Sequence, residues 1–218
     1  MTKKVIFAAS LFLILTTITF QQKLTIPKFY LKKIIIENNN LITDEDIKKL
    51  LRDLYNKNLL LINNAEIKNA LIKNSLIESF NLKKKYPDIL RIEIYEKKPI
   101  AILLKNKNKF YLSDKIDLIE FKNFKSEKQL PYVLGDEKIF KNFYEELKRI
   151  NFPFNIAKKY TLYESNRWDI ETINNKVIKL PSQNFIYSLQ NYLEIKDKIN
   201  FQKYKLFDYR IKNQLILK

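Results

Sequence analysis

The 218-residue chain contains no cysteine, no histidine and a single glycine. Without cysteine there is no disulfide and no thiolate ligand, and without histidine the chain lacks the commonest metal ligand and general base. One glycine also excludes a glycine-rich loop that cradles phosphates. The acidic residues show no paired-carboxylate motif. We therefore expect a protein that is not an enzyme, with no catalytic residue, no cofactor and no metal site.

Basic residues outnumber acidic ones by 41 to 24, which gives a formal net charge of +17. Such an excess is typical of proteins that bind nucleic acids or anionic membranes. Only five of the basic residues are arginine, however, and phosphate recognition favours the planar fork of arginine over lysine. Lysine, isoleucine and asparagine, all abundant here, have codons rich in adenine and thymine. We attribute most of the charge to this bias and expect neither nucleic acid nor a small-molecule substrate as partner.

An uncharged apolar run begins directly after Lys4 and covers residues 5–20. Sixteen helical residues rise about 24 Å, a little less than the roughly 30 Å hydrocarbon core, and the flanking Lys4 and Lys23 have side chains long enough to reach the interface. A cleaved signal peptide and a buried helix are the alternatives. Residues 17–19 make a poor cleavage site, and the run has no amphipathic stripe.

These features predict that residues 1–23 form a short cytoplasmic tail and a transmembrane anchor. Lys3 and Lys4 favour a cytoplasmic N-terminus, and a long lysine-rich domain after the span does not oppose this orientation. Everything after about Lys23 then lies on the outer side of the membrane.

Residues 29–96 alternate between strand and helix signals. We expect strands at residues 29–37, 77–86 and 89–96, and helices that begin after Thr43 and Asn63. Each helix start carries an acidic residue three positions after its cap, Asp46 and Glu66, as capping boxes do. Pro87 and Asp88 form a turn between the last two strands. The predicted order is β-α-α-β-β.

Pro99 marks a break after this unit, because proline cannot donate to a continuing strand ladder. The single glycine, Gly135, indicates a backbone position with positive φ. Beyond the break we expect helices at 139–150 and from Ser182 to about residue 197, and strands at 160–164, 167–173, 176–180, 204–211 and 214–218. This pattern predicts a mostly antiparallel sheet with two helices.

The last predicted strand, residues 214–218, is apolar. A terminal strand often lies at a sheet edge, where its N–H and C=O groups can pair with another chain. Leu215, Ile216 and Leu217 are consecutive, so each face of this strand carries at least one apolar side chain. The alternative is a fully packed strand that neighbouring elements protect.

Several short motifs follow one another along the chain. They are Glu-x-x-Pro-Ile-Ala at residues 96–101, Leu-x-Asp at 112–114, Leu-Pro-x-x-x-Gly at 130–135, Arg-Trp-Asp-Ile at 167–170, Lys-Leu-Pro at 179–181 and Asp-x-Arg at 208–210. Each motif is weak by itself. The ordered set, together with the predicted span and the β-α-α-β-β unit, resembles the bacterial cell-division protein family FtsQ/DivIB over essentially the whole chain.

The resemblance implies an α+β protein with a transmembrane helix, a polypeptide-transport-associated (POTRA) domain at residues 29–97 and a β domain at residues 98–218. It also implies a non-enzymatic divisome scaffold at the inner membrane, with a cytoplasmic N-terminus, periplasmic domains and a midcell position during division. Such a scaffold recruits and regulates septal cell-wall synthesis proteins through membrane partners similar to FtsB and FtsL.

In this family the main partner adds a strand to the C-terminal edge of the β domain. The resemblance therefore assigns a partner site to Arg167, Tyr209, Arg210, Ile211, Gln214, Leu215, Ile216 and Leu217. Arg167 and Arg210 would anchor acidic side chains of the partner, and Tyr209 and Ile211 would add contact area. As an alternative, Arg210 forms a structural ion pair with Asp208. Trp168, the only tryptophan, is expected in the core.

Two turns depart from the family pattern. Residues 115–117 occupy a turn that usually carries glycine, and Asn174-Asn175 stands where Asn-Gly is usual. A second function remains open, namely a membrane-tethered POTRA chaperone for envelope proteins. Chaperones of this type usually have tandem POTRA units or an attached barrel, and this sequence shows no internal repeat.

Overall fold

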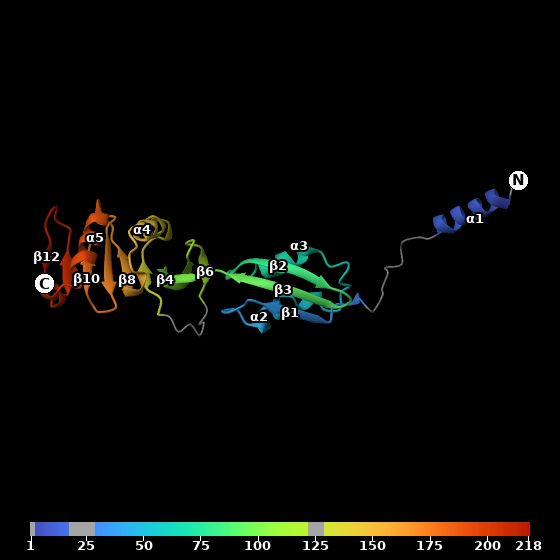
Figure 1. The fold of residues 1–218 in the computed structure, drawn as a ribbon, viewed down its shortest axis with the longest axis horizontal. Helices are drawn as coiled ribbons and strands as arrows, with labels where there is room; N and C mark the ends of the chain where they lie inside the picture. The colour runs from blue at the N-terminus through green and yellow to red at the C-terminus, as the bar shows by residue number, and fades with distance from the viewer. Residues whose placement is uncertain (1–2, 18–28, 122–128) are drawn as a thin grey trace. The chain divides into compact units, whose positions relative to one another are not determined.

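The computed structural model describes residues 3–17, 29–121 and 129–218. The chain divides into two compact units (Figure 1). The first comprises residues 1–38, 44–73 and 80–94, and the second comprises residues 39–43, 74–79 and 95–218.

The predicted membrane span begins with a helix in the structure. Helix α1 covers Lys3–Thr17 and has no acidic residue in its first turn. Within the described ranges, no helix combines the length and the apolar character that a membrane crossing requires. The last part of the predicted span, residues 18–20, lies outside the described residues. The anchor therefore stays a prediction.

The first unit has the predicted β-α-α-β-β order. Its elements are β1 (Lys33–Glu37), α2 (Asp44–Leu50), the 3₁₀ helix η2 (Arg52–Leu54), α3 (Asn64–Leu71), β2 (Ile77–Lys85) and β3 (Ile89–Glu96), except that residues 77–79 of β2 and 95–96 of β3 belong to the second unit. The strands form a sheet of order β1-β3-β2, in which β1 runs parallel to β3. The two long strands end within one residue of the predicted bounds.

Local sequence signals explain the helices of this unit. Asn63 caps α3, because its side chain accepts a hydrogen bond from the backbone N–H of Ala65. Apolar residues at helical spacing in α2 and η2 are buried: Ile47, Leu51 and Leu54 are each at most 2% exposed. These side chains form the core of the unit together with Leu90, Ile92 and Ile94, which alternate with polar residues on β3.

The second unit is built on a nine-stranded sheet of order β12-β11-β10-β9-β8-β7-β4-β5-β6. These strands are β4 (Pro99–Lys105), β5 (Asn108–Ser113), β6 (Leu118–Glu120), β7 (Tyr132–Leu134), β8 (Ala157–Leu162), β9 (Trp168–Thr172), β10 (Val177–Lys179), β11 (Leu206–Asp208) and β12 (Ile216–Leu217). Five neighbouring pairs are antiparallel and three are parallel, so the sheet is mostly antiparallel, as predicted.

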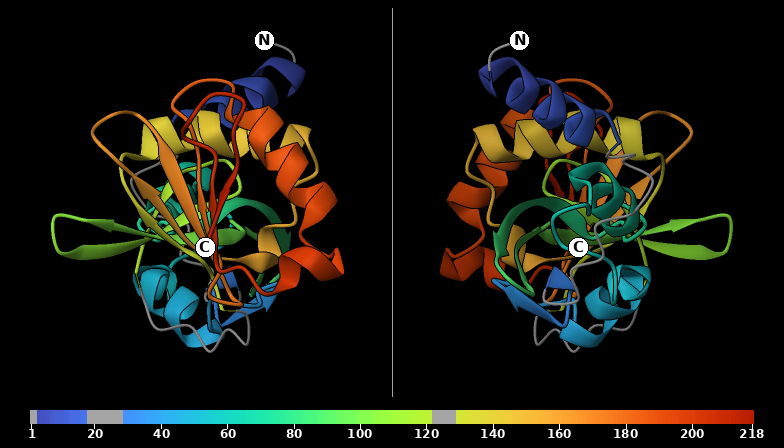
Figure 2. Two further views of the ribbon diagram at one scale, coloured as in Figure 1. Left: turned by 90° about the vertical axis from the view of Figure 1, so that its left-hand side faces the viewer. Right: turned by 90° about the vertical axis from the view of Figure 1, so that its right-hand side faces the viewer.

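Two long helices accompany this sheet, α4 (Glu137–Arg149) and α5 (Phe185–Ile195), with the short η3 (Phe154–Ile156) and α6 (Ile199–Gln202). Figure 2 shows the yellow α4 and the orange α5 along one side of the strands. Apolar residues in register across seven strands share the core with them: Leu103, Val133, Tyr160, Ile170, Ile178, Phe207 and Leu217. Trp168 lies in this core and stacks on Phe143 of α4, which confirms its expected position.

The structure corrects the predictions at Pro99 and Ser182 and describes two turn positions, Gly135 and Ile116. Pro99 is the first residue of β4, because a proline at that position leaves the rest of the ladder intact. Helix α5 begins after Asn184, which has positive φ and makes no side-chain cap, so the predicted cap at Ser182 is wrong. Gly135 has the predicted positive φ, +158°, and a Cβ there would also lie 2.7 Å from Cβ of Leu162, so close approach requires glycine as well. Ile116 adopts φ 63° in the turn that usually carries glycine.

Candidate functional site

Strand β12 lies at one edge of the nine-stranded sheet, and within residues 29–121 and 129–218 it pairs with β11 alone. Lys218 and Leu206 exchange two backbone hydrogen bonds, of 2.9 and 3.2 Å. Bonded and non-bonded pairs alternate along an antiparallel ladder. Ile216 therefore directs its N–H and C=O toward Asp208, whereas those of Leu217 point away from the sheet. The outward groups of Leu217 are the ones that an added strand would use.

The side chains of this edge divide between the two faces of the sheet. Leu215 and Leu217 are partly buried against the core. Ile216 lies on the opposite face and is 37% exposed, and Ile211 in the preceding loop is 51% exposed. Gln214 closes that loop, where its N–H donates to the C=O of Ile211 at 3.2 Å. The edge thus combines open backbone groups with accessible apolar side chains.

Both predicted arginine anchors are paired with aspartates of the same sheet face. Arg210 binds Asp208 through two nitrogens, with Nε at 2.8 Å from Oδ1 and Nη2 at 2.6 Å from Oδ2. Nη1 of Arg167 lies 2.7 Å from Oδ1 of Asp169, and its guanidinium stacks 4.1 Å above the Tyr163 ring. The alternative role considered for Arg210, an ion pair with Asp208, is therefore present.

The strand register joins these pairs into one row. Lys179 on β10 faces Asp169 on one side and Asp208 on the other, and Asp208 in turn faces Ile216 of β12. Arg167, Lys179 and Arg210 together exceed the two aspartates by one positive charge. The row therefore forms a basic surface that leads to the open edge, and we call it the basic row.

The two aspartates of the basic row have opposite pKa shifts. The hydrogen bonds from Arg210 hold the pKa of Asp208 below its ordinary value. Burial raises the pKa of Asp169, although the nearby charges of Arg167, Lys179 and Arg210 oppose this. Asp169 is only 5% exposed, so its ionised form depends on those three cations and on a hydrogen bond with Tyr163.

The predicted partner residues differ in how much surface they offer. The Arg210 side chain is 44% exposed, but that of Arg167 is only 19% exposed. Tyr209 is buried and its hydroxyl makes a 3.0 Å hydrogen bond with Asn191 of α5. Burial raises the pKa of this hydroxyl well above its ordinary value, which keeps it protonated. Tyr209 thus positions the loop before β12 and offers little contact area.

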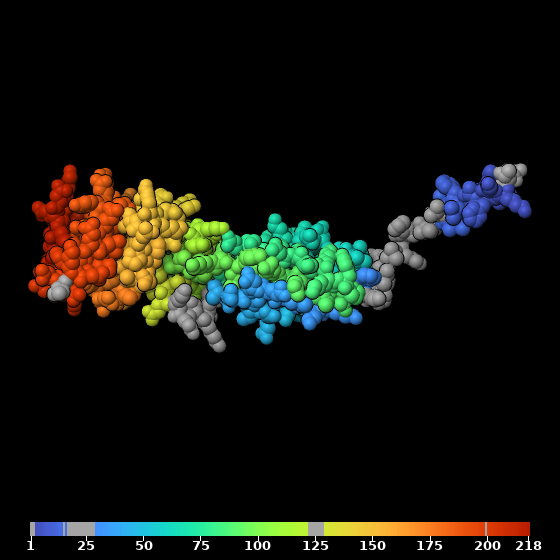
Figure 3. Space-filling model, viewed as in Figure 1, coloured from blue at the N-terminus to red at the C-terminus, as the bar shows by residue number. Residues whose placement is uncertain are grey.

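An open pocket of about 870 Å³ lies beside this edge. It is bounded by the start of α5, including Tyr187 and Asn191, and by the loop from Tyr209 to Leu215. In Figure 3 the last residues of the chain, in red, form an outer surface of the second unit. The pocket, the open strand and Arg210 therefore belong to one accessible region.

Sequence reasoning did not identify Lys179, Tyr163 and Asp169 as parts of this surface. The sequence did contain a signal for this surface. Residues 167 and 169 flank the buried Trp168 and so point to the other face of the strand, and the predicted hairpin places Lys179 opposite Asp169. No local pattern in the sequence predicts that Asp208 lies beside Lys179. The parallel strands β10 and β11 are connected through helix α5, so no hairpin turn fixes their register.

Comparisons with known proteins show which proteins this chain is similar to. The family model "POTRA domain, FtsQ-type" matches residues 29–97. The cell division protein FtsQ of Rickettsia bellii is 28% identical over 194 residues, which cover 85% of this chain and 71% of that protein. FtsQ of Rickettsia conorii is 28% identical over 206 residues, which cover 91% of this chain and 75% of that protein. The chain therefore resembles FtsQ proteins over most of its length and matches the FtsQ-type POTRA model over residues 29–97.

The model match identifies residues 29–97 as a POTRA domain of FtsQ type, and the similarity to FtsQ proteins supports a role in cell division. Among solved structures, the major extracytoplasmic domain of DivIB from Geobacillus stearothermophilus is similar with a TM-score of 0.35 and 15% identity. That match covers 49% of this chain and 96% of that chain.

Proposed function

We propose that this protein is a non-enzymatic divisome scaffold that binds partner membrane proteins through the β12 edge. The observation that carries the proposal is the outward N–H and C=O of Leu217 on an edge strand with one neighbour among the described residues. A partner segment similar to those of FtsB or FtsL would add a strand there and extend the sheet. Through that contact the scaffold recruits and regulates septal cell-wall synthesis proteins.

The basic row supports a partner segment with acidic side chains. Arg210 is held by Asp208 in a fixed orientation, yet its guanidinium keeps accessible surface. A fixed guanidinium recognises a carboxylate at a smaller entropic cost than a mobile lysine. Arg167 is largely covered, so its contribution is to hold Asp169 and keep the row in place.

The location that we propose is the inner membrane, with residues 1–23 as cytoplasmic tail and single-span anchor. The uncharged run at residues 5–20 supports this, and the flanking Lys4 and Lys23 suit a short span. The two domains, at residues 29–97 and 98–218, would then be periplasmic, where membrane partners of the divisome expose their own segments.

Imaging in dividing cells tests this function. A fluorescent fusion to the full chain is expected to form a band at midcell and to bring the FtsB-like partner with it after detergent extraction and affinity capture. A uniform envelope signal without captured partner would contradict the proposal. A C-terminal reporter that is active only in the periplasm tests the topology separately.

A further inference from the structure

Exposed apolar side chains gather at the end of the first unit where its chain begins. Leu60, Leu61 and Tyr86 are 48%, 74% and 54% exposed. Phe29, the first described residue of this unit, packs its ring against Tyr86 with centroids 6.2 Å apart. We call these four residues the entry patch. Patches of this kind on a folded unit mark interaction surfaces.

Backbone hydrogen bonds hold the entry patch in one place. The N–H of Leu59 donates to the C=O of Phe29 at 2.8 Å, which ties the 58–61 turn to the start of the unit. Within that turn Oδ1 of Asn58 accepts from the N–H of Leu60 at 3.0 Å. Leu60 and Leu61 are therefore presented outward by a fixed turn.

Lysines lie next to the apolar side chains along the chain. Lys83 and Lys85 are exposed on β2 directly before Tyr86. Lys84, between them, donates to the C=O of Ile62 at 2.6 Å, next to the 58–61 turn. Lys32 keeps 67% of its side chain exposed although it lies 3.9 Å from Asp88, and Lys57 pairs with Glu66 beside the turn. These five lysines outnumber the two carboxylates paired with them. Leucine and aromatic side chains flanked by lysines are typical of surfaces that bind the interface of an anionic bilayer.

The sequence also brings this end of the unit near the predicted anchor. Eleven residues, 18–28, separate Thr17 at the end of α1 from Phe29. Twelve residue steps span at most about 40 Å. A membrane-inserted N-terminal helix therefore keeps the entry patch within reach of the bilayer surface.

We propose that the entry patch docks the first unit on the anionic membrane surface. Leu60 and Leu61 enter the boundary between headgroups and acyl chains, Phe29 and Tyr86 lie at headgroup level, and the lysines contact lipid phosphates. This inference rests on the proposed membrane anchoring, but it involves no residue of the β12 edge. Docking would fix the orientation of the POTRA domain at the membrane while the β12 edge stays available to partners.

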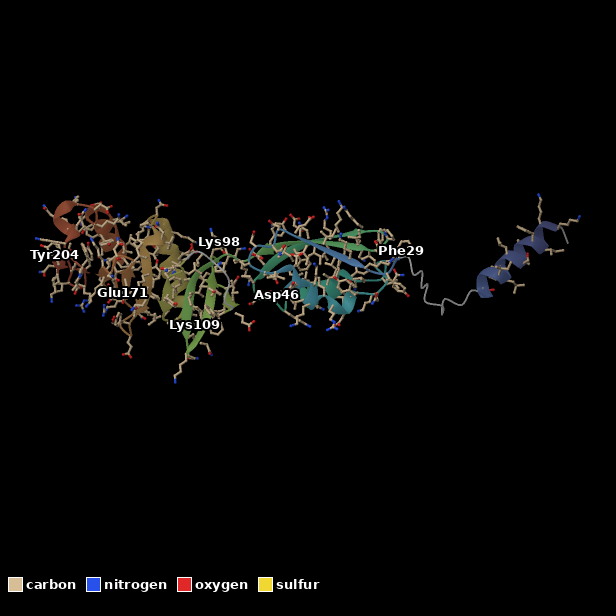
Figure 4. All side chains as sticks on the ribbon, turned by 90° about the horizontal axis from the view of Figure 1, so that it is seen from below. Phe29, Asp46, Lys98, Lys109, Glu171 and Tyr204 are labelled. Atoms are coloured by element: carbon tan, nitrogen blue, oxygen red, sulfur yellow. The ribbon has the colours of Figure 1, made fainter. Side chains whose placement is uncertain are left out.

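Single-cysteine labelling tests the docking directly, because the natural chain has no cysteine. The full chain carrying Leu61→Cys is labelled with an environment-sensitive fluorophore and reconstituted in vesicles of phosphatidylethanolamine and phosphatidylglycerol that contain spin-labelled lipid. Glu45→Cys is the matched control. Glu45 is exposed on α2 of the same unit, next to Asp46, which Figure 4 places at the opposite end from Phe29.

We expect the spin label to quench the probe at position 61 roughly threefold more than the probe at position 45. Adding Leu60→Asp to the Leu61→Cys chain should reduce its quenching to the control level, and vesicles of phosphatidylcholine alone should weaken it. Equal quenching at both positions in the anionic vesicles would overturn the proposal, as would a full chain that does not associate with them. Leu60→Asp should leave partner capture unchanged, which separates this test from the test of the scaffold function.

Discussion

The two edges of the nine-stranded sheet differ in whether side chains cover their outward backbone groups. At the β6 edge the outward N–H of Glu120 donates to Oγ of Ser75 at 2.9 Å, and the ion pair between Lys115 and Glu78 lies beside it. At the β12 edge the described residues provide no such cover for Leu217. One edge is thus closed by side chains of the same unit, and the other keeps the hydrogen-bonding groups that attract a further strand.

This difference shows that edge protection in this sheet is selective. Proteins commonly cover or charge their edge strands to prevent aggregation. Here the covered edge lies beside β5, while the open edge adjoins the basic row and the pocket at α5. This contrast supports our proposal that the open edge is kept for a specific partner.

The largest expected effect is a loss of partner affinity when proline replaces Leu217 at the open edge. Because the N–H of Leu217 points away from the sheet, Leu217→Pro removes a donor from the partner ladder and leaves the bonds between Lys218 and Leu206 in place. We expect about a hundredfold loss of affinity for the FtsB-like partner, close to 2.7 kcal/mol, by titration of the purified full chain.

Two control variants separate the loss of the N–H donor from other effects of the substitution. Leu217→Ala keeps the donor and should lose much less affinity. Leu118→Pro removes an outward N–H from the covered β6 edge and should leave partner affinity unchanged. If Leu118→Pro weakened binding as strongly as Leu217→Pro, the two edges would not differ in the way described.

A smaller effect on stability is expected from Arg210→Gln, which leaves the nearly buried Asp208 without its guanidinium. The predicted loss at neutral pH is about 1 kcal/mol in the free energy of unfolding, because solvent screens the half-exposed arginine. Arg149→Gln is the matched control, since its pair with Glu146 on α4 is an exposed i,i+3 contact worth about 0.5 kcal/mol or less. Urea unfolding measures both variants.

The same substitution predicts a pH dependence. The folded-state pKa of Asp208 is lowered by its hydrogen bonds with Arg210, so its contribution is fully present above the unfolded value of about 3.9 and is lost as pH falls through the lower folded pKa. The stability difference between the natural chain and Arg210→Gln should therefore be largest at neutral pH and shrink in acid. A difference that grew as the pH fell would refute this assignment.

The smallest effect is expected at the covered edge. Ser75→Ala removes the acceptor of the Glu120 N–H, which then bonds to water because this region is exposed. We expect a loss of about 0.5 kcal/mol in unfolding experiments and no change in partner affinity. Partner binding at β6 in this variant, detected as a second site in the titration, would show that the Ser75 cover alone distinguishes the two edges.

Sequence reasoning was most accurate where the signal is local. The bounds of β2 and β3 follow from alternation and from the Pro87-Asp88 turn, and the Asn63 cap follows from residue type and spacing. Strand β4 was missed because Pro99 indicates a break, although proline at a first strand position is compatible with a ladder.

Only part of the candidate site could be predicted from the sequence. The apolar run at residues 214–218 predicts the terminal strand, and the Asp-x-Arg motif points to Arg210. The basic row depends on the register between β10 and β11, and the cover on β6 depends on Ser75, which is 45 residues from Glu120 in the chain. Such pairings are set by tertiary packing and leave no local pattern in the sequence.

Amide hydrogen exchange at Leu217 tests the central claim most directly. In the free protein its outward N–H should exchange quickly, whereas the N–H of Lys218, bonded to Leu206, should exchange more slowly. Saturation with the FtsB-like partner is expected to slow exchange at Leu217 by at least about tenfold, as pairing with an added strand requires. Exchange at Leu217 that stays unchanged while the partner is bound would contradict the account.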